Sequence, residues 1–115
     1  MSEVLAQLDA VIAERRRSAD PSSSYVAKLC QGGLDRILKK VAEESGETLI
    51  AAKNVERGGD PRELVAETAD LWFHCLVMLA RLDMQSSDVL AELERRFDLS
   101  GIAEKAARQT TPRAD

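Results

Sequence analysis

The chain is poor in aromatic residues, cysteine and histidine. Aromatic side chains make up 3% of its 115 residues, and there are two cysteines and one histidine. A core with few aromatics is built of Leu, Val, Ile and Ala, which is typical of helix bundles. Cys30 and Cys75 form no CxxC pair, so we expect two reduced thiols in a cytoplasmic protein and no zinc site.

The chain also lacks a long apolar run and a concentrated basic surface. Its longest apolar stretch, Leu71 to Ala80, is interrupted by His74 and is too short to span a bilayer. The N-terminus has no signal-peptide pattern. The formal net charge is −4, and we expect the one basic run, Arg15 to Arg17, at the C-terminus of a helix. We therefore expect a soluble protein whose partner is neither a membrane nor a nucleic acid.

Apolar residues recur at helical spacing along the chain, and no segment alternates as a strand would. Helices are expected from about Val4 to Arg17, from a cap among Ser22 to Ser24 to about Leu29, Leu34 to about Glu56, Asp60 to about Leu82 and Ser86 or Ser87 to Phe97. The short Gly58-Gly59-Asp60 connection forces the two long helices into an antiparallel hairpin. The predicted fold class is therefore all-α, a helical bundle completed by oligomerisation.

Capping residues and proline indicate where helices begin, and the lack of linkers indicates a single domain. Asp60-Pro61-Arg62-Glu63 has the pattern of an N-cap, a proline at the first helical position and a capping-box glutamate. Internal repeats and low-complexity linkers are absent from the sequence. We expect one helical domain over residues 1–109, with a loose turn after Gly101, and a disordered tail over residues 110–115.

Two acidic clusters, one in each long helix, are the most informative motifs. The first contains Glu43, Glu44 and Glu47, and the second contains Glu67 and Asp70. Residues three apart share a helix face, so the packed helices would bring Glu44, Glu47, Glu67 and Asp70 to one point. Carboxylates that converge repel one another unless a cation neutralises them. Oxygen ligands of this kind favour Mg²⁺, which in turn suits phosphate chemistry.

The alternative to a metal site is a solvated helix face. There, Lys39 and Lys40 would each pair with the glutamate four residues later, for about 0.3–0.5 kcal/mol per pair. A di-iron centre is not expected, because it needs Glu-x-x-His on two helices and His74 is the only histidine. We expect His74 to be a hydrogen-bonded residue beside the acidic clusters rather than a ligand, and Trp72 to be a half-buried packing residue.

These motifs resemble a known family. Glu43-Glu44-x-x-Glu47 followed by Glu67-x-x-Asp70 is similar to the signature of the all-α, MazG-like nucleotide pyrophosphatases. Longer stretches narrow the resemblance to the phosphoribosyl-ATP pyrophosphatase family: Ser24 to Leu29, Lys39 to Glu44, Ala51 to Asn54 and Asp70 to Leu79. The resemblance covers about Leu5 to Gln109 and departs from the family pattern at Ala42 and Gly46.

The resemblance implies hydrolysis of 1-(5-phosphoribosyl)-ATP between the α and β phosphates, the second step of histidine biosynthesis. The products would be phosphoribosyl-AMP and pyrophosphate. Matching the motif assigns Glu44, Glu47, Glu67 and Asp70 as Mg²⁺ ligands. The catalytic candidates are Glu43, as ligand or base, and Glu44. The candidates for binding substrate phosphate are Lys39, Lys40 and Lys53.

We also expect a homodimer or a larger assembly, because a helical hairpin with an apolar stripe on each long helix buries little surface alone. The resemblance points the same way. Two other functions stay open: a house-cleaning pyrophosphatase for ordinary or damaged nucleoside triphosphates, and a non-catalytic helical oligomerisation module. Pyrophosphate release from phosphoribosyl-ATP and from deoxynucleoside triphosphates distinguishes the three.

Overall fold

The computed structural model describes residues 2–99, and this part of the chain contains helices and no strand. The helices are α1 (Ser2–Ser18), α2 (Tyr25–Gln31), α3 (Leu34–Glu56), α4 (Pro61–Arg81) and α5 (Ser86–Phe97). The prediction of an all-α fold is confirmed. The expected turn after Gly101 and the tail over 110–115 lie outside the described residues. Within residues 2–99, each helix is too short or too polar to cross a membrane.

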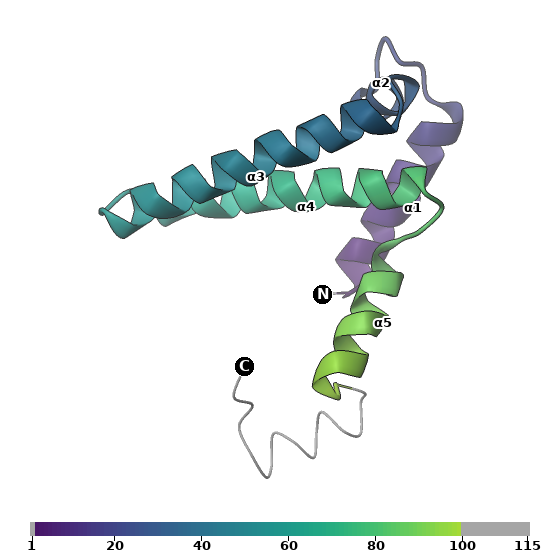
Figure 1. The fold of residues 1–115 in the computed structure, drawn as a ribbon. Helices are drawn as coiled ribbons and strands as arrows, with labels where there is room; N and C mark the ends of the chain where they lie inside the picture. The colour runs from purple at the N-terminus through teal and green to yellow at the C-terminus, as the bar shows by residue number, and fades with distance from the viewer. Residues whose placement is uncertain (1, 100–115) are drawn as a thin grey trace.

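Helices α3 and α4 form the predicted antiparallel hairpin, which projects from the other helices (Figure 1). A Schellman motif ends α3: the Gly58 N–H donates to the Val55 carbonyl at 3.0 Å, and the Gly59 N–H donates to the Asn54 carbonyl at 2.8 Å. Gly58 has a φ of 99°, a conformation that residues with a Cβ rarely adopt. The chain therefore reverses within a few residues.

The start of α4 follows the predicted pattern only in part. The Asp60 side chain caps the helix by accepting the Arg62 backbone N–H at 2.9 Å, and Pro61 occupies the first turn. The expected capping box with Glu63 is not formed. The Glu63 carboxylate instead accepts a hydrogen bond from Asn54 Nδ2 at 3.3 Å, which links the two helices beside the turn.

The start of α5 corrects the sequence prediction, because neither Ser86 nor Ser87 is its N-cap. Gln85 caps the helix, and its backbone N–H donates to the Asp88 carboxylate at 3.0 Å in a capping box. Ser86 is instead engaged by a distant partner, since its N–H and hydroxyl both donate to the Asp9 carboxylate of α1. Because Ser86 bonds to Asp9 of α1, the residue before it, Gln85, takes the N-cap position.

The hydrophobic core lies at one end of the hairpin. We call this end the corner; it comprises α1, α2, α5, residues 34–44 of α3 and residues 71–81 of α4 (Figure 1). Its buried cluster consists of Ile12, Val26, Leu29, Ile37, Leu76 and Val77. The rest of the hairpin, residues 45–70, we call the arm, and among these residues only Ala51 is buried.

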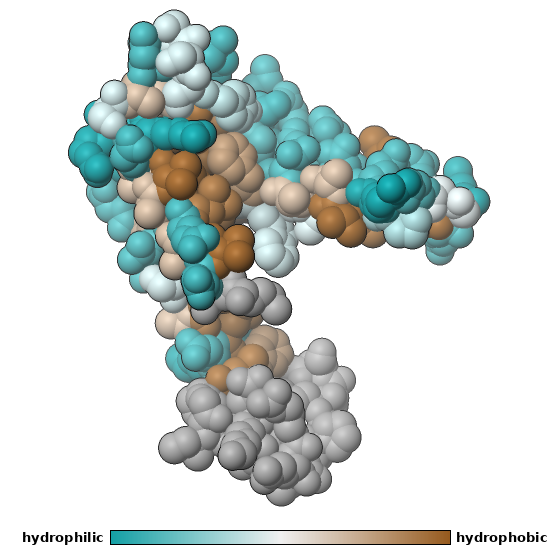
Figure 2. Space-filling view, turned by 180° about the vertical axis from the view of Figure 1, so that it is seen from behind, coloured by the Kyte–Doolittle hydropathy of each residue, from teal (hydrophilic) through white to brown (hydrophobic). Residues whose placement is uncertain are grey.

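The arm exposes large apolar side chains. The exposed fractions of Leu49, Ile50 and Val65 are 70%, 63% and 67%. Figure 2 shows apolar residues both on the arm and in a larger area over the corner. Trp72, expected to be half buried, is 57% exposed, because its side of α4 faces an open apolar hollow lined by Leu93 of α5.

Candidate metal centre

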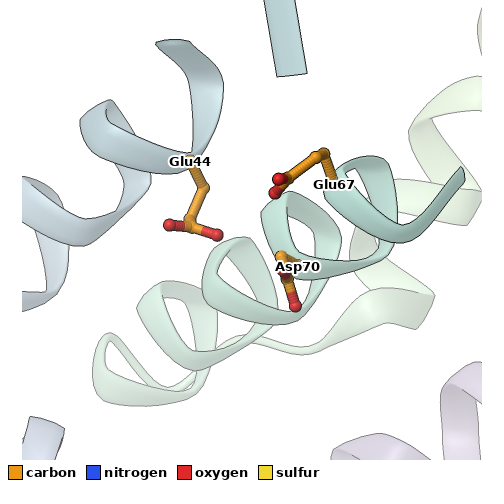
Figure 3. A group of neighbouring side chains, drawn as sticks. All are labelled: Glu44, Glu67 and Asp70. Atoms are coloured by element: carbon orange, nitrogen blue, oxygen red, sulfur yellow. The ribbon is translucent and has the colours of Figure 1, made fainter. Parts of the chain in front are cut away.

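Three carboxylates from facing helices meet where the arm joins the corner. Glu44 of α3 and Glu67 and Asp70 of α4 each place a carboxylate oxygen within 4.8 Å of the others. Figure 3 shows Glu44 reaching from α3 toward the two α4 residues. Residues three apart share a helix face, which explains why Glu67 and Asp70 lie together. The structure thus brings together three of the four carboxylates expected to converge.

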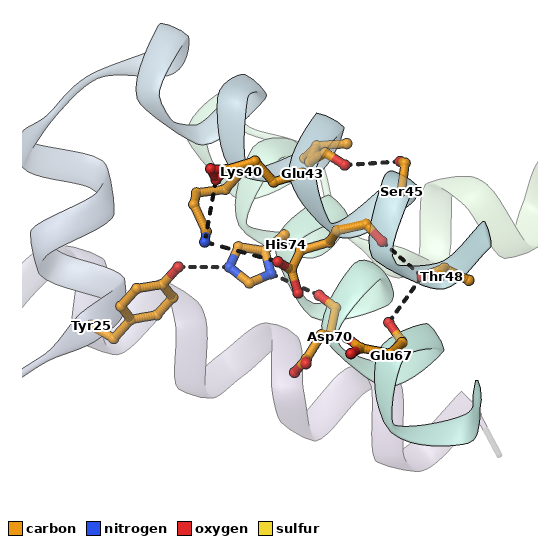
Figure 4. Close-up of polar contacts among 10 residues, drawn as sticks. Tyr25, Lys40, Glu43, Ser45, Thr48, Glu67, Asp70 and His74 are labelled. Carbon is orange, nitrogen blue, oxygen red and sulfur yellow. Dashed lines mark hydrogen bonds and ion pairs between the residues drawn. The ribbon is translucent and has the colours of Figure 1, made fainter. Parts of the chain in front are cut away.

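Glu44 is the most deeply buried member of this group, with 6% of the residue exposed. Its carboxylate lies 3.8 Å from the Lys40 ammonium, which also lies 3.6 Å from the Glu43 carboxylate (Figure 4). The ion pair expected for a solvated face therefore exists at Lys40. One ammonium shared by two carboxylates does not balance the negative charge of the group, so a cation would still be favoured.

The crowding of carboxylates changes the pKa of Glu67. Burial raises the pKa of the Glu67 carboxyl, and the negative charges of Glu47, Asp70 and Glu44 raise that pKa further. Glu47 is exposed and lies outside the tight group, but it is close enough to Glu67 to act on it. A divalent cation between these carboxylates would relieve the repulsion that raises the pKa.

The predicted phosphate-binding lysines fall into two places. Lys39 and Lys40 line a surface hollow together with Arg36 and Glu43, and Lys40 is the one whose ammonium lies 3.8 Å from the Glu44 carboxylate. Lys53 forms an ion pair with Glu56 near the far end of α3. Lys53 lies nine residues after Glu44, which corresponds to about 14 Å along the helix axis. The structure therefore groups Lys39 with Lys40 and separates Lys53 from them.

A threonine ties the two ligand-bearing helices together at the group. The Thr48 hydroxyl of α3 lies 2.8 Å from the Glu44 carbonyl and 3.2 Å from the Glu67 carbonyl (Figure 4). The sequence analysis gave Thr48 no role at the site. Threonine often bonds to the carbonyl four residues earlier in a helix, so the sequence alone gives only a weak signal for the contact across helices.

His74 and Tyr25 form a second polar contact beside the carboxylates. The Tyr25 hydroxyl lies 2.7 Å from His74 Nε2, and His74 Nδ1 lies 2.7 Å from the Asp70 carbonyl (Figure 4). The prediction that His74 is hydrogen-bonded is confirmed. The sequence analysis assigned no role to Tyr25, whose contact with His74 spans 49 residues of sequence.

The residues of the site fit a hard cation better than covalent chemistry. Carboxylate oxygens are the ligands that Mg²⁺ prefers. A nucleophilic cysteine would need a lowered pKa, whereas burial raises the pKa of the Cys30 and Cys75 thiols. The arrangement can therefore hold a divalent cation between two helices, next to lysines that would attract phosphate.

Comparisons with known proteins agree with the resemblance found in the sequence. A family model described as phosphoribosyl-ATP pyrophosphohydrolase matches residues 5–97. Similar proteins include those named phosphoribosyl-ATP pyrophosphatase from Burkholderia cenocepacia (strain HI2424) and Burkholderia orbicola (strain MC0-3). Each is 52% identical over 113 residues, covering 98% of this chain and 93% of the relative. The chain therefore belongs to the phosphoribosyl-ATP pyrophosphohydrolase family.

Proposed function

We propose that this chain hydrolyses phosphoribosyl-ATP to phosphoribosyl-AMP and pyrophosphate, the second step of histidine biosynthesis. The names of its relatives support this substrate. The observation that carries the proposal is the group of three carboxylates on facing helices, with the Lys40 ammonium beside it. Such a group suits a metal-assisted attack on a polyphosphate.

Mg²⁺ is the proposed cofactor, with Glu44, Glu67 and Asp70 as its ligands. Bound there, Mg²⁺ would neutralise charge on the phosphate oxygens and stabilise the departing pyrophosphate. Glu47 is the proposed fourth ligand, because its charge already acts on Glu67. Glu43 is the proposed base that takes a proton from the attacking water, since it lies outside the group and shares Lys40 with Glu44.

The two roles of Glu43 and Glu47 can be separated by experiment. A Glu47→Gln variant should raise the Mg²⁺ concentration needed for half-maximal activity, because a ligand has been lost. A Glu43→Gln variant should lower kcat and leave that concentration unchanged, because a proton acceptor has been lost. The reverse pattern would exchange the two assignments.

Lys39 and Lys40 are the proposed binding residues for substrate phosphate. Both line a surface hollow with Glu43, and Lys40 already bridges Glu43 and Glu44. Lys53, the third candidate, lies about 14 Å further along α3. It would contact a distant part of the substrate or belong to the site of a second copy, so we rank it below the other two.

We propose that the exposed apolar side chains of the arm are buried against a second copy of the chain in a homodimer. Large apolar side chains of the arm, among them Leu49, Ile50 and Val65, lie in solvent without a partner helix. Pairing two arms would complete a helical bundle. Sedimentation equilibrium should then give twice the chain mass of 12.6 kDa.

The proposed activity is tested by pyrophosphate release from phosphoribosyl-ATP and from the four deoxynucleoside triphosphates, with and without Mg²⁺. We expect release from phosphoribosyl-ATP only when Mg²⁺ is present. Faster release from the deoxynucleoside triphosphates would favour a house-cleaning pyrophosphatase, and release from none would favour an oligomerisation module. The proposed location is the cytoplasm, where the free thiols of Cys30 and Cys75 would stay reduced.

A further inference from the structure

Tyr25 connects α2 to both helices that carry the candidate ligands. Its hydroxyl lies 2.7 Å from His74 Nε2 on α4. On α3, Lys40 and Glu44 are close enough to act on the phenol: burial raises the pKa of Tyr25, Lys40 lowers it and Glu44 raises it. Tyr25 thus lies at one side of the carboxylate group, against His74, and the proposed mechanism does not use it (Figure 4).

The direction of the two hydrogen bonds follows from the acceptors. A carbonyl oxygen only accepts, so His74 Nδ1 must carry the hydrogen that it shares with the Asp70 carbonyl at 2.7 Å. In the neutral ring, Nε2 then has a free lone pair and accepts the Tyr25 hydroxyl. Two consecutive bonds therefore run from α2 to the helical turn that bears Asp70.

Two aromatic rings pack near the histidine ring, each roughly perpendicular to it. Phe73 meets it edge-on with ring centroids 5.1 Å apart, and Tyr25 meets it edge-on at 5.6 Å. His74 is 5% exposed, and a buried apolar side chain would avoid the cost of desolvating two ring nitrogens. Tyr25 itself is 48% exposed, so the buried member of the contact is His74, and both of its ring nitrogens have partners. Leaving a buried ring nitrogen without its partner is costly, and the contact therefore specifies geometry.

We propose that Tyr25 and His74 are positioning residues for the metal centre: their two hydrogen bonds fix the Asp70 turn of α4 relative to α2 and hold the Asp70 carboxylate opposite Glu44. This inference rests on the proposed function of the site. Misplacing a reacting group by about 1 Å can cost as much as 100-fold in rate, so a small displacement of this turn would matter.

A Tyr25→Phe variant tests the inference because it removes only the hydroxyl. We expect kcat to fall about tenfold, with KM for phosphoribosyl-ATP changed less than about twofold, and a several-fold higher Mg²⁺ concentration for half-maximal activity. The melting temperature without Mg²⁺ should fall modestly, because buried His74 Nε2 loses its partner. Phe73→Leu is the matched control: it loosens the same aromatic cluster, so it should lower the melting temperature and keep kcat within about twofold of wild type.

Substitutions at His74 separate the two bonds. His74→Gln places an acceptor near Nε2 and keeps the bond to Tyr25, whereas His74→Asn keeps only the donor near Nδ1. In the His74→Asn background, Tyr25→Phe should cost no more than about twofold in kcat, because its partner has already gone. His74→Gln should retain the larger dependence on the Tyr25 hydroxyl.

Two outcomes would overturn the inference. One is a Tyr25→Phe enzyme with wild-type kcat and Mg²⁺ dependence, and the other is an equal tenfold loss in the wild-type and His74→Asn backgrounds. A wild-type protein that fails to cleave phosphoribosyl-ATP would instead refute the proposed function. The inference would then be judged by whether Tyr25→Phe reduces the rise in melting temperature that Mg²⁺ produces.

Discussion

Helices α3 and α4 run through both the corner and the arm, yet their surroundings differ in the two regions. In the corner, Ile37 of α3 and Val77 of α4 are fully buried among residues of α1 and α2. In the arm, α3 and α4 contact mainly each other, and Ile50 is 63% exposed. The candidate ligands lie at the boundary between these two regions.

The difference indicates a division of roles between folding, in the corner, and binding, in the arm. The corner contains nearly all of the buried apolar side chains of residues 2–99, and burial of each large aliphatic side chain contributes roughly 1.5–3 kcal/mol. The arm gains little in this way within one chain. Its exposed apolar residues are therefore available for a second copy, and its acidic residues are available for a cation. Four predictions test this division.

The largest effect is expected for Glu44→Gln at the boundary. Losing a charged ligand should lower kcat by about 10³-fold, which is about 4 kcal/mol of transition-state stabilisation. The melting temperature without Mg²⁺ should stay the same or rise, because the change removes a buried charge without removing volume. Initial rates and thermal melts measure the two effects. Turnover near that of wild type would contradict the assignment of Glu44.

A matched pair of isoleucines compares the regions directly. Ile37→Ala in the corner should lower the free energy of unfolding by about 2–5 kcal/mol, because it leaves a cavity. Ile50→Ala in the arm should cost much less in dilute protein, and its cost should grow with protein concentration as the dimer forms. Urea unfolding at two concentrations checks this. Equal, concentration-independent losses would refute the division.

A charge on the arm should weaken self-association. Leu49→Asp would place a carboxylate in the proposed interface, so we expect the dissociation constant of the dimer to rise at least about tenfold. Val4→Asp is the control, because Val4 is similarly exposed but belongs to α1 in the corner. Analytical ultracentrifugation measures both. If Val4→Asp dissociates the dimer and Leu49→Asp does not, the interface lies on the corner.

The smallest effect concerns the pH dependence of Mg²⁺ binding. The folded state raises the pKa of Glu67, so without metal it loses stability as pH rises from the ordinary glutamate pKa to the raised value. Mg²⁺ removes this penalty, and several millimolar Mg²⁺ should therefore raise the melting temperature more at pH 8 than at pH 5. Glu67→Gln should melt higher than wild type without Mg²⁺ and respond less to it. A wild-type shift that does not depend on pH would contradict the prediction.

Much of the fold and part of the site could be predicted from the sequence because the signals are local. Apolar spacing located the helices, and Gly58 with Asp60 located the hairpin turn. The three-residue step between Glu67 and Asp70 placed both on one face of α4. The sequence by itself therefore determined that acidic faces of two long antiparallel helices would come near each other.

Only the tertiary structure decided which of those residues meet. The crossing of α3 over α4 placed Glu44 in the tight group and left Glu47 beside it, and α2 brought Tyr25 to His74. The contact of Asp9 with Ser86 likewise moved the start of α5 from the expected cap. Spacing along one helix fixes the direction of a side chain on that helix. The distance between side chains on different helices depends on how the helices pack, and local sequence patterns do not specify that packing.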